Sequence, residues 1–74
     1  MTSEEEEIGK LKVEAVNAIE KNTILKIIDN LAAYGKSKYR TRAIDAILFI
    51  VNTKTDKDVK AYALDLVKKI KEGK

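Results

Sequence analysis

The sequence predicts an all-α protein, a compact four-helix bundle that forms a single helical domain over residues 1–74. Three observations support this prediction. Apolar residues recur every three or four positions in four segments, which is the spacing of one face of an α-helix. Residues that begin and end helices lie between those segments. The connections are about two or three residues long, so we expect consecutive helices to pack against each other.

The first helix is expected at about residues 3–20. Thr2 or Ser3 can serve as its N-cap, and the acidic run Glu4–Glu7 lies at the positive end of the helix dipole. Its apolar stripe comprises Ile8, Leu11, Ala15, Ala18 and Ile19.

The second helix is expected at about residues 23–34, because Asn22 tolerates the conformation that stops a helix and Thr23 is a good N-cap. Gly35 follows at the position where a helix C-cap takes a positive φ, and we expect that conformation there. The apolar stripe of this helix comprises Ile24, Ile27, Ile28, Leu31 and Tyr34.

The third helix is expected at about residues 38–52, and it is apolar nearly all round. A helix of this kind is usually buried, so we expect it to be central and to contact the other three. Leu48 and Phe49 exceed what one apolar face needs. We interpret them as core, and an interface with a partner or a second copy is the alternative. A strand over residues 46–51 is a further alternative, because that run is rich in β-branched residues.

The fourth helix is expected at about residues 56–71, with Thr55 or Asp56 as its N-cap and Gly73 closing its end. It shares a short pattern with the third helix. Residues 43–47 read Ala-Ile-Asp-Ala-Ile, and residues 63–67 read Ala-Leu-Asp-Leu-Val, twenty positions later. We interpret the match as a shared amphipathic period, and a solenoid-like array of related helices is the alternative.

The composition argues against catalysis. The chain has no His and no Cys, so the common pairs of nucleophile and base cannot form. The paired carboxylates Asp56 and Asp58, and the run Glu4–Glu7, lie at helix starts, where capping explains them. Isolated glycines form no phosphate-binding loop. We therefore expect no catalytic, cofactor-binding or metal-binding residue, no enzymatic activity and no cofactor.

The sequence also bears on location. Its longest apolar run, residues 46–51, is far shorter than the roughly 20 residues that cross a bilayer. The N-terminus is acidic, where a signal peptide would be basic. These features predict a soluble cytoplasmic protein that has no contact with a membrane.

One segment is strongly basic. Residues 34–42 contain Lys36, Lys38, Arg40 and Arg42, with two tyrosines interleaved and no acid. The two arginines lie near the start of the third helix, where the helix dipole disfavours cations. Such a segment can hold phosphate groups of a nucleic acid. The alternative is a solvated loop that glutamates of the first helix balance.

The C-terminal half resembles two families. The pattern Thr-Asp-Lys-Asp-Val-Lys at 55–60, followed by Ala63 and by the Leu-Val-Lys-Lys-Ile-Lys of 66–71, looks like the last helices of the transcription elongation factor IIS N-terminal domain family. Thr41, Ile44 and Ile47 fall roughly where that family has a Thr and two apolar positions. The same stretch is similar to the second helix of HEAT-type repeats. The resemblance implies a small helical module that binds a helix or a short peptide.

Three functions follow from the sequence. Caps, dipole-matched charges and amphipathic stripes agree almost everywhere, which is typical of an idealised or designed scaffold with no evolved activity. Such a scaffold is expected to be a thermostable monomer that requires no partner. The alternative is a natural protein–protein interaction module. The third is a nucleic-acid accessory protein that uses residues 36–42.

Overall fold

The computed structural model describes residues 3–54 and 56–73, and it confirms the all-α four-helix prediction. The helices are α1 (Ser3–Asn17), α2 (Lys21–Ala32), α3 (Arg40–Thr53) and α4 (Lys57–Lys71), with a 3-10 turn, η1 (Ala33–Lys36), after α2. No strand occurs within the described ranges, so the strand alternative for residues 46–51, which lie inside α3, is wrong.

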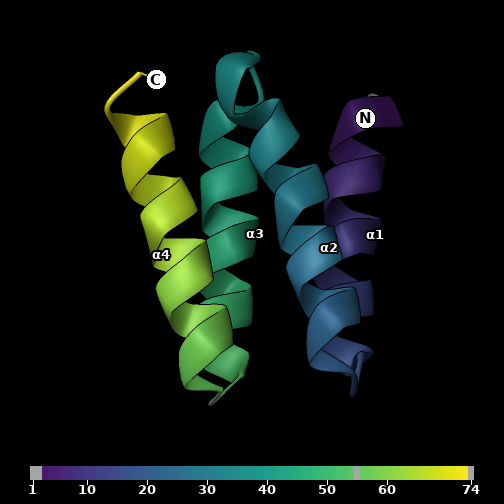
Figure 1. Ribbon diagram of the computed structural model, residues 1–74. Helices are drawn as coiled ribbons and strands as arrows, with labels where there is room; N and C mark the ends of the chain where they lie inside the picture. Colours follow the sequence, from purple (N-terminus) through teal and green to yellow (C-terminus); the bar gives the residue numbers. More distant parts are fainter. Residues whose placement is uncertain (1–2, 55, 74) are drawn as a thin grey trace.

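The helices run alternately in opposite directions, as Figure 1 shows. Helix α3 contacts the other three helices, which confirms its predicted central position. Helix α2 shares that position, since it also packs against α1, α3 and α4. Helices α1 and α4 lie on opposite sides of this central pair. In cross-section the four helices therefore form a rhombus, and its short diagonal joins α2 and α3.

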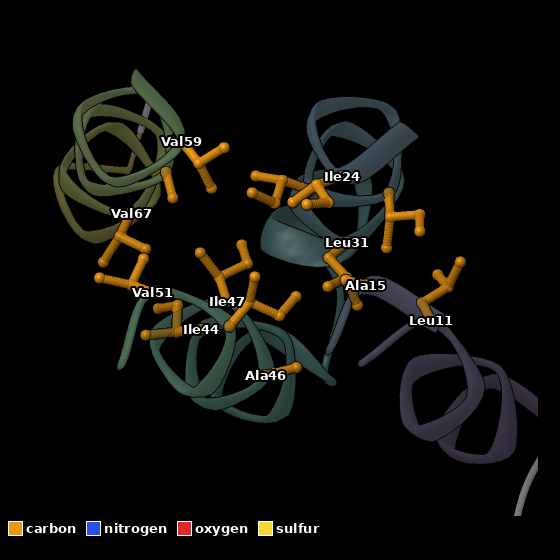
Figure 2. Close-up of a cluster of buried hydrophobic side chains, with 14 of the residues drawn as sticks. Leu11, Ala15, Ile24, Leu31, Ile44, Ala46, Ile47, Val51, Val59 and Val67 are labelled. Atoms are coloured by element: carbon orange, nitrogen blue, oxygen red, sulfur yellow. The ribbon is translucent and has the colours of Figure 1, made fainter. Parts of the chain in front are cut away.

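The four helices form two layers. Helices α1 and α3 lie in one layer and α2 and α4 in the other, as the view along the helices in Figure 2 shows. Within each layer the two helices are parallel, and polar contacts join them. The contacts between α1 and α3 are Glu5–Arg42 and Lys12–Phe49, and those between α2 and α4 are Lys21–Asp58 and Asp29–Tyr62. The chain is thus a pair of antiparallel helical hairpins stacked side by side.

The two hairpins repeat one burial pattern. The buried residues Ile8, Leu11, Ala15, Ile24 and Ile28 are followed, 35 positions later in each case, by the buried residues Ala43, Ala46, Ile50, Val59 and Ala63. This period is close to that of helical repeat proteins, whose units are also helix pairs. The match at twenty positions instead relates α3 to α4, which are antiparallel neighbours within one hairpin, so it does not mark the structural unit.

The core is apolar throughout the described ranges, where no polar or charged residue is buried. Its largest fully buried side chains come from α2, α3 and α4; they are Ile28, Leu31, Ile47, Ile50 and Val59. Figure 2 shows Leu31, Ile47 and Val59 pointing into a common interior. Burying each such side chain stabilises the fold by about 1.5–3 kcal/mol.

The first connection differs from the prediction. Helix α1 ends at Asn17 rather than at residue 20, and Ile19 is 96% exposed instead of lying on the apolar stripe. The ammonium of Lys54, at the end of α3, donates to the carbonyl of Ala18 at 2.7 Å. That bond satisfies one of the carbonyls that the end of α1 leaves without a partner inside the helix. The stop is therefore fixed by a residue distant in sequence.

Helix α2 begins two residues earlier than predicted. Glu20 has the extended backbone of an N-cap, but its side chain makes no capping bond. Asn22 and Thr23, the predicted stop and cap, instead lie in the first turn of α2. Residues 18–20 form the connection between α1 and α2.

Gly35 has a different role from the predicted one. Its φ is not positive; among the described residues the positive φ belongs to Gly73, at 76°. Gly35 is buried, and a Cβ built on it would lie 2.7 Å from Cγ1 of Ile70. A glycine is needed here because α4 packs directly on the turn. The expected C-cap conformation is confirmed at Gly73 and wrong at Gly35.

The second connection is longer than predicted because η1 continues the chain past Ala32. Tyr34, expected in the second helix, lies in this turn and is partly buried. The hydroxyl of Ser37 donates to the carbonyl of Tyr34 at 2.9 Å and accepts from the N–H of Tyr39 at 3.0 Å. This local bonding holds residues 37–39 out of the helix, so α3 begins at Arg40 instead of residue 38.

The start of α4 agrees with the prediction within one residue. The carboxylate of Asp56 accepts from the N–H groups of Asp58 and Val59, at 2.8 and 3.1 Å. This confirms Asp56 as the N-cap. The candidate caps Thr2 and Thr55 lie outside the described residues.

Replacement by alanine should have opposite effects on stability at Gly35, in η1, and at Gly9, in α1. Gly35→Ala places a methyl group against Ile70 and should destabilise the fold by about 1–3 kcal/mol. Gly9→Ala meets nothing within 4 Å and should stabilise α1 by about 0.5–1 kcal/mol. Urea denaturation followed by circular dichroism measures both. A Gly35→Ala protein as stable as the original would contradict the packing of η1 on α4.

Candidate functional site

Within residues 3–54 and 56–73 no helix is long and apolar enough to cross a membrane. The same ranges contain no group of three or more His, Cys, Asp or Glu side chains able to hold a metal ion. The expected lack of catalytic, cofactor-binding and metal-binding residues stays a prediction. The features that remain are surfaces at which apolar and charged side chains are exposed.

The surplus apolar surface of α3 is only partly core. The bundle buries Ile44 and Val51 and partly covers Leu48, but Phe49 remains 49% exposed. The interpretation of Phe49 as a core residue is therefore wrong. Its position on α3 turns it toward the outer side of the layer that α1 and α3 form, where no further helix follows.

Phe49 forms one wall of a hollow between α1 and α3, which we call the Phe49 groove. Its volume is about 300 Å³. Its lining combines apolar and small residues with charged ones. The lining residues are Glu5, Ile8, Gly9, Lys12, Arg42, Asp45, Ala46 and Phe49.

The Phe49 ring is held in position from one side. The ammonium of Lys12 lies 5.0 Å from the ring centroid, which is a cation–π contact between α1 and α3. At an exposed site such a contact contributes about 0.5–1 kcal/mol. Part of the ring is therefore covered by the chain itself, and the rest stays accessible in the groove.

Gly9 differs from the other glycines. Gly35 accommodates Ile70, and Gly73 takes a positive φ, so each has a reason within the chain. Gly9 lies in the middle of α1, with no atom within 4 Å of where its Cβ would be. A glycine there costs about 1 kcal/mol of helix stability relative to alanine. Its open backbone faces the Phe49 groove.

One end of the groove is closed by an ion pair. A guanidinium nitrogen of Arg42 lies 3.0 Å from a carboxylate oxygen of Glu5, whose side chain is only 19% exposed. Because α1 and α3 are parallel, the acidic start of α1 lies beside the basic start of α3. This confirms, for Arg42, the alternative that glutamates of the first helix balance the basic segment.

Arg40 points to the other side of α3. Its guanidinium donates to the carbonyl of Lys71 at 3.2 Å, at the end of α4. The start of α3 lies next to the end of α4 because the two helices are antiparallel. A cation that is unfavourable for α3 is therefore favourable for α4, whose dipole is negative there. This compensation involves a neighbouring helix, so the sequence of the third helix alone does not predict it.

The four cations of the basic segment consequently do not form one patch. Arg42 belongs to the α1 side and Arg40 to the α4 side. The ammonium of Lys38 lies 5.4 Å from the centroid of the Tyr39 ring, and Lys36 lines a second groove beside Arg40. A nucleic-acid site that uses all four together has less geometric support than the sequence suggested.

The layer that α2 and α4 form is held by polar pairs. The phenol of Tyr62 donates to Asp29, and this bond raises the pKa of Tyr62 because ionisation would remove the donated proton beside a carboxylate. Lys21 and Asp58 lie 2.8 Å apart; their hydrogen bond raises the pKa of Lys21 and lowers that of Asp58. These groups have partners within the chain and offer no reactive site.

Comparisons with family models, with curated proteins and with solved structures find no match for this chain. The resemblances to HEAT-type helices and to the elongation factor domain family therefore stay predictions. The function must be inferred from the surfaces.

The Tyr62–Asp29 bond predicts a specific titration. In a protein whose other tyrosines are replaced by Phe, the phenolate absorbance of Tyr62 should appear above the ordinary pKa of 10.0. Asp29→Asn should shift it back toward that value, whereas Asp45→Asn, an equal charge change in the other layer, should not. The bond's contribution to stability is present below pH 10 and is lost as the pH rises through the raised folded pKa. Equal titrations of the two variants would contradict the contact.

Proposed function

We propose that the chain is a protein-interaction module that binds one helix of a partner protein in the Phe49 groove. The observation that carries the proposal is the pairing of an open, helix-interior glycine with a half-exposed Phe on the facing helix. Within the chain, Gly9 costs stability and Phe49 leaves apolar surface in water. A bound partner covers the apolar surface of Phe49 and uses the space that Gly9 leaves open.

The groove favours a helix as its occupant. It lies between two parallel helices, as the grooves that accept amphipathic helices commonly do. The missing Cβ at Gly9 lets a partner backbone come close to α1, and Ile8 and Ala46 add apolar floor. A large apolar side chain of the partner contacts the accessible part of the Phe49 ring. This arrangement requires apolar residues at helical spacing on the partner.

The rim adds selectivity. Lys12 and Asp45 bring opposite charges to the groove, so a partner helix with charges flanking its apolar stripe binds in one orientation. The stacked hairpins supply a rigid frame for these groups. The same architecture agrees with the resemblance to HEAT-type helices, which itself implies a partner-binding surface.

A second candidate is the idealised scaffold with no evolved activity. The observation that favours it is the agreement of local and global structure: an apolar core, the Asp56 cap and the three lysines in the last turn of α4. In this case the protein is a monomer whose melting temperature exceeds about 90 °C and does not depend on concentration. A midpoint that rises with concentration would favour association instead.

The Phe49 groove predicts a modest stability cost for Phe49→Ala. A fully buried Phe costs about 3–5 kcal/mol when it is truncated. Phe49 is half exposed, so the loss should stay below about 2 kcal/mol. Urea denaturation measures it. A loss of 3 kcal/mol or more would place the ring in the core and remove the proposed binding surface.

The binding proposal is tested by selecting a displayed library of amphipathic helical peptides against the original protein. Selected peptides should share apolar positions at helical spacing. Phe49→Ser and Gly9→Leu should each weaken their binding by at least about tenfold, because one removes an anchor and the other fills the hollow.

Val13→Ser is the matched control, since Val13 is an exposed apolar residue of α1 that does not line the groove. It should leave the affinity unchanged. Peptides that lack an apolar stripe, or that bind all three variants equally, would contradict the proposal. Gly9→Ala adds a stricter test, since it should weaken binding while it stabilises the fold.

A further inference from the structure

A second groove lies at the opposite side of α3. It is formed where η1 meets the end of α4, near the C-terminus in Figure 1, and we call it the η1–α4 groove. Its volume is about 490 Å³. Its lining includes Ala32, Ala33, Gly35, Ile70, Lys36 and Arg40.

The floor of this groove is small and apolar. Gly35 is buried, and Ile70 packs directly on its backbone. Two alanines, Ala32 and Ala33, form the adjoining wall. No large side chain occupies the hollow, so it has room for one small apolar side chain of a ligand.

The rim is cationic. Lys36 and Arg40 line the groove, and Lys68, Lys69 and Lys71 lie in the last turn of α4. The sequence has no acid between Asp29 and Asp45, and at the end of α4 the cations outnumber the exposed acid Glu72. Lys69 is paired with Asp65 at 3.1 Å. A positive potential over an apolar floor is complementary to a ligand with carboxylates beside an apolar group.

Arg40 is already positioned for this role. Its bond to the carbonyl of Lys71 holds the guanidinium at the rim, and that bond uses one of five N–H donors. A ligand carboxylate can therefore bind without first ordering a long side chain, which lowers the entropic cost.

We propose that the η1–α4 groove binds an acidic peptide segment of a partner protein. A small apolar side chain of the segment lies beside Ile70 and the two alanines, and carboxylates on either side bind Lys36 and Arg40. This site is separate from the Phe49 groove, from which α3 divides it, and does not depend on it.

A peptide fits better than a nucleic acid. Arg42, the fourth cation of the basic segment, is bound to Glu5 in the other layer. The apolar floor has no role in phosphate binding but offers a contact to a peptide side chain.

The test uses fluorescence anisotropy with a short labelled peptide that is rich in glutamate and has one central valine. The double variant Lys36→Glu/Arg40→Glu should weaken its binding by at least about tenfold. Lys10→Glu/Lys26→Glu makes the same charge change at exposed positions of α1 and α2 outside the groove, and it should have a much smaller effect. Circular dichroism confirms that each variant is folded.

Two further probes separate the sources of binding. Replacing the central valine by serine should weaken binding about threefold or more, because the apolar floor then contacts a polar group. Replacing the glutamates by glutamines should abolish binding. Labelled oligothymidylate should bind more weakly than the acidic peptide at the same salt concentration.

Three results would overturn the proposal. The first is equal affinity of the acidic peptide for the two double variants, which would mean that the loss of binding depends only on the net charge of the protein. The second is equal binding of the glutamate and glutamine peptides. The third is tighter binding of oligothymidylate that the Lys36→Glu/Arg40→Glu variant abolishes, which would assign the groove to nucleic acid.

Discussion

The packing of α2 against α3 is the constraint on which the rest of the structure depends. A chain of 74 residues without cysteine has only its core to stabilise it, and the largest fully buried side chains include Ile28 and Leu31 of α2 and Ile47 and Ile50 of α3. Helices α1 and α4 pack on opposite sides of this central pair. Because α1 and α4 lie on opposite sides, each covers only one side of α3. One groove therefore remains between α1 and α3, and another remains where η1 meets the end of α4 beside α3.

Helix ends are satisfied by residues from other helices, and this fixes how the hairpins stack. Lys54 at the end of α3 binds the carbonyl that follows α1, and Arg40 at the start of α3 binds the carbonyl that ends α4. Each bond places a cation at the negative end of a neighbouring dipole. The directions of the helices and the charges of the sequence therefore support the same arrangement.

The sequence predicted what single helices determine. Period and caps located four helices, the central α3, the Asp56 cap and a glycine, Gly73, at the end of α4. It failed where another helix decides the outcome. Gly35 is required by Ile70 of α4 rather than by its own φ. The 35-residue repeat is carried by burial alone, because its paired residues differ in size, as Ile8 and Ala43 do.

The two proposed surfaces were only partly visible in the sequence. Phe49 and the cations at 36–42 were singled out, yet periodicity could not show that Phe49 stays half exposed or that Arg40 and Arg42 point to opposite sides of α3. Gly9 was counted only as an isolated glycine. Its significance depends on knowing that nothing in the chain approaches it.

Native-state hydrogen exchange tests the central claim most directly, because it reports the free energy of opening for each amide. The packing predicts that the amides of Leu31 in α2 and Ile50 in α3 exchange only through global unfolding, whereas those of α1 and of the last turn of α4 exchange through smaller openings. Greater protection in α1 or α4 than in α2 and α3 would contradict the account.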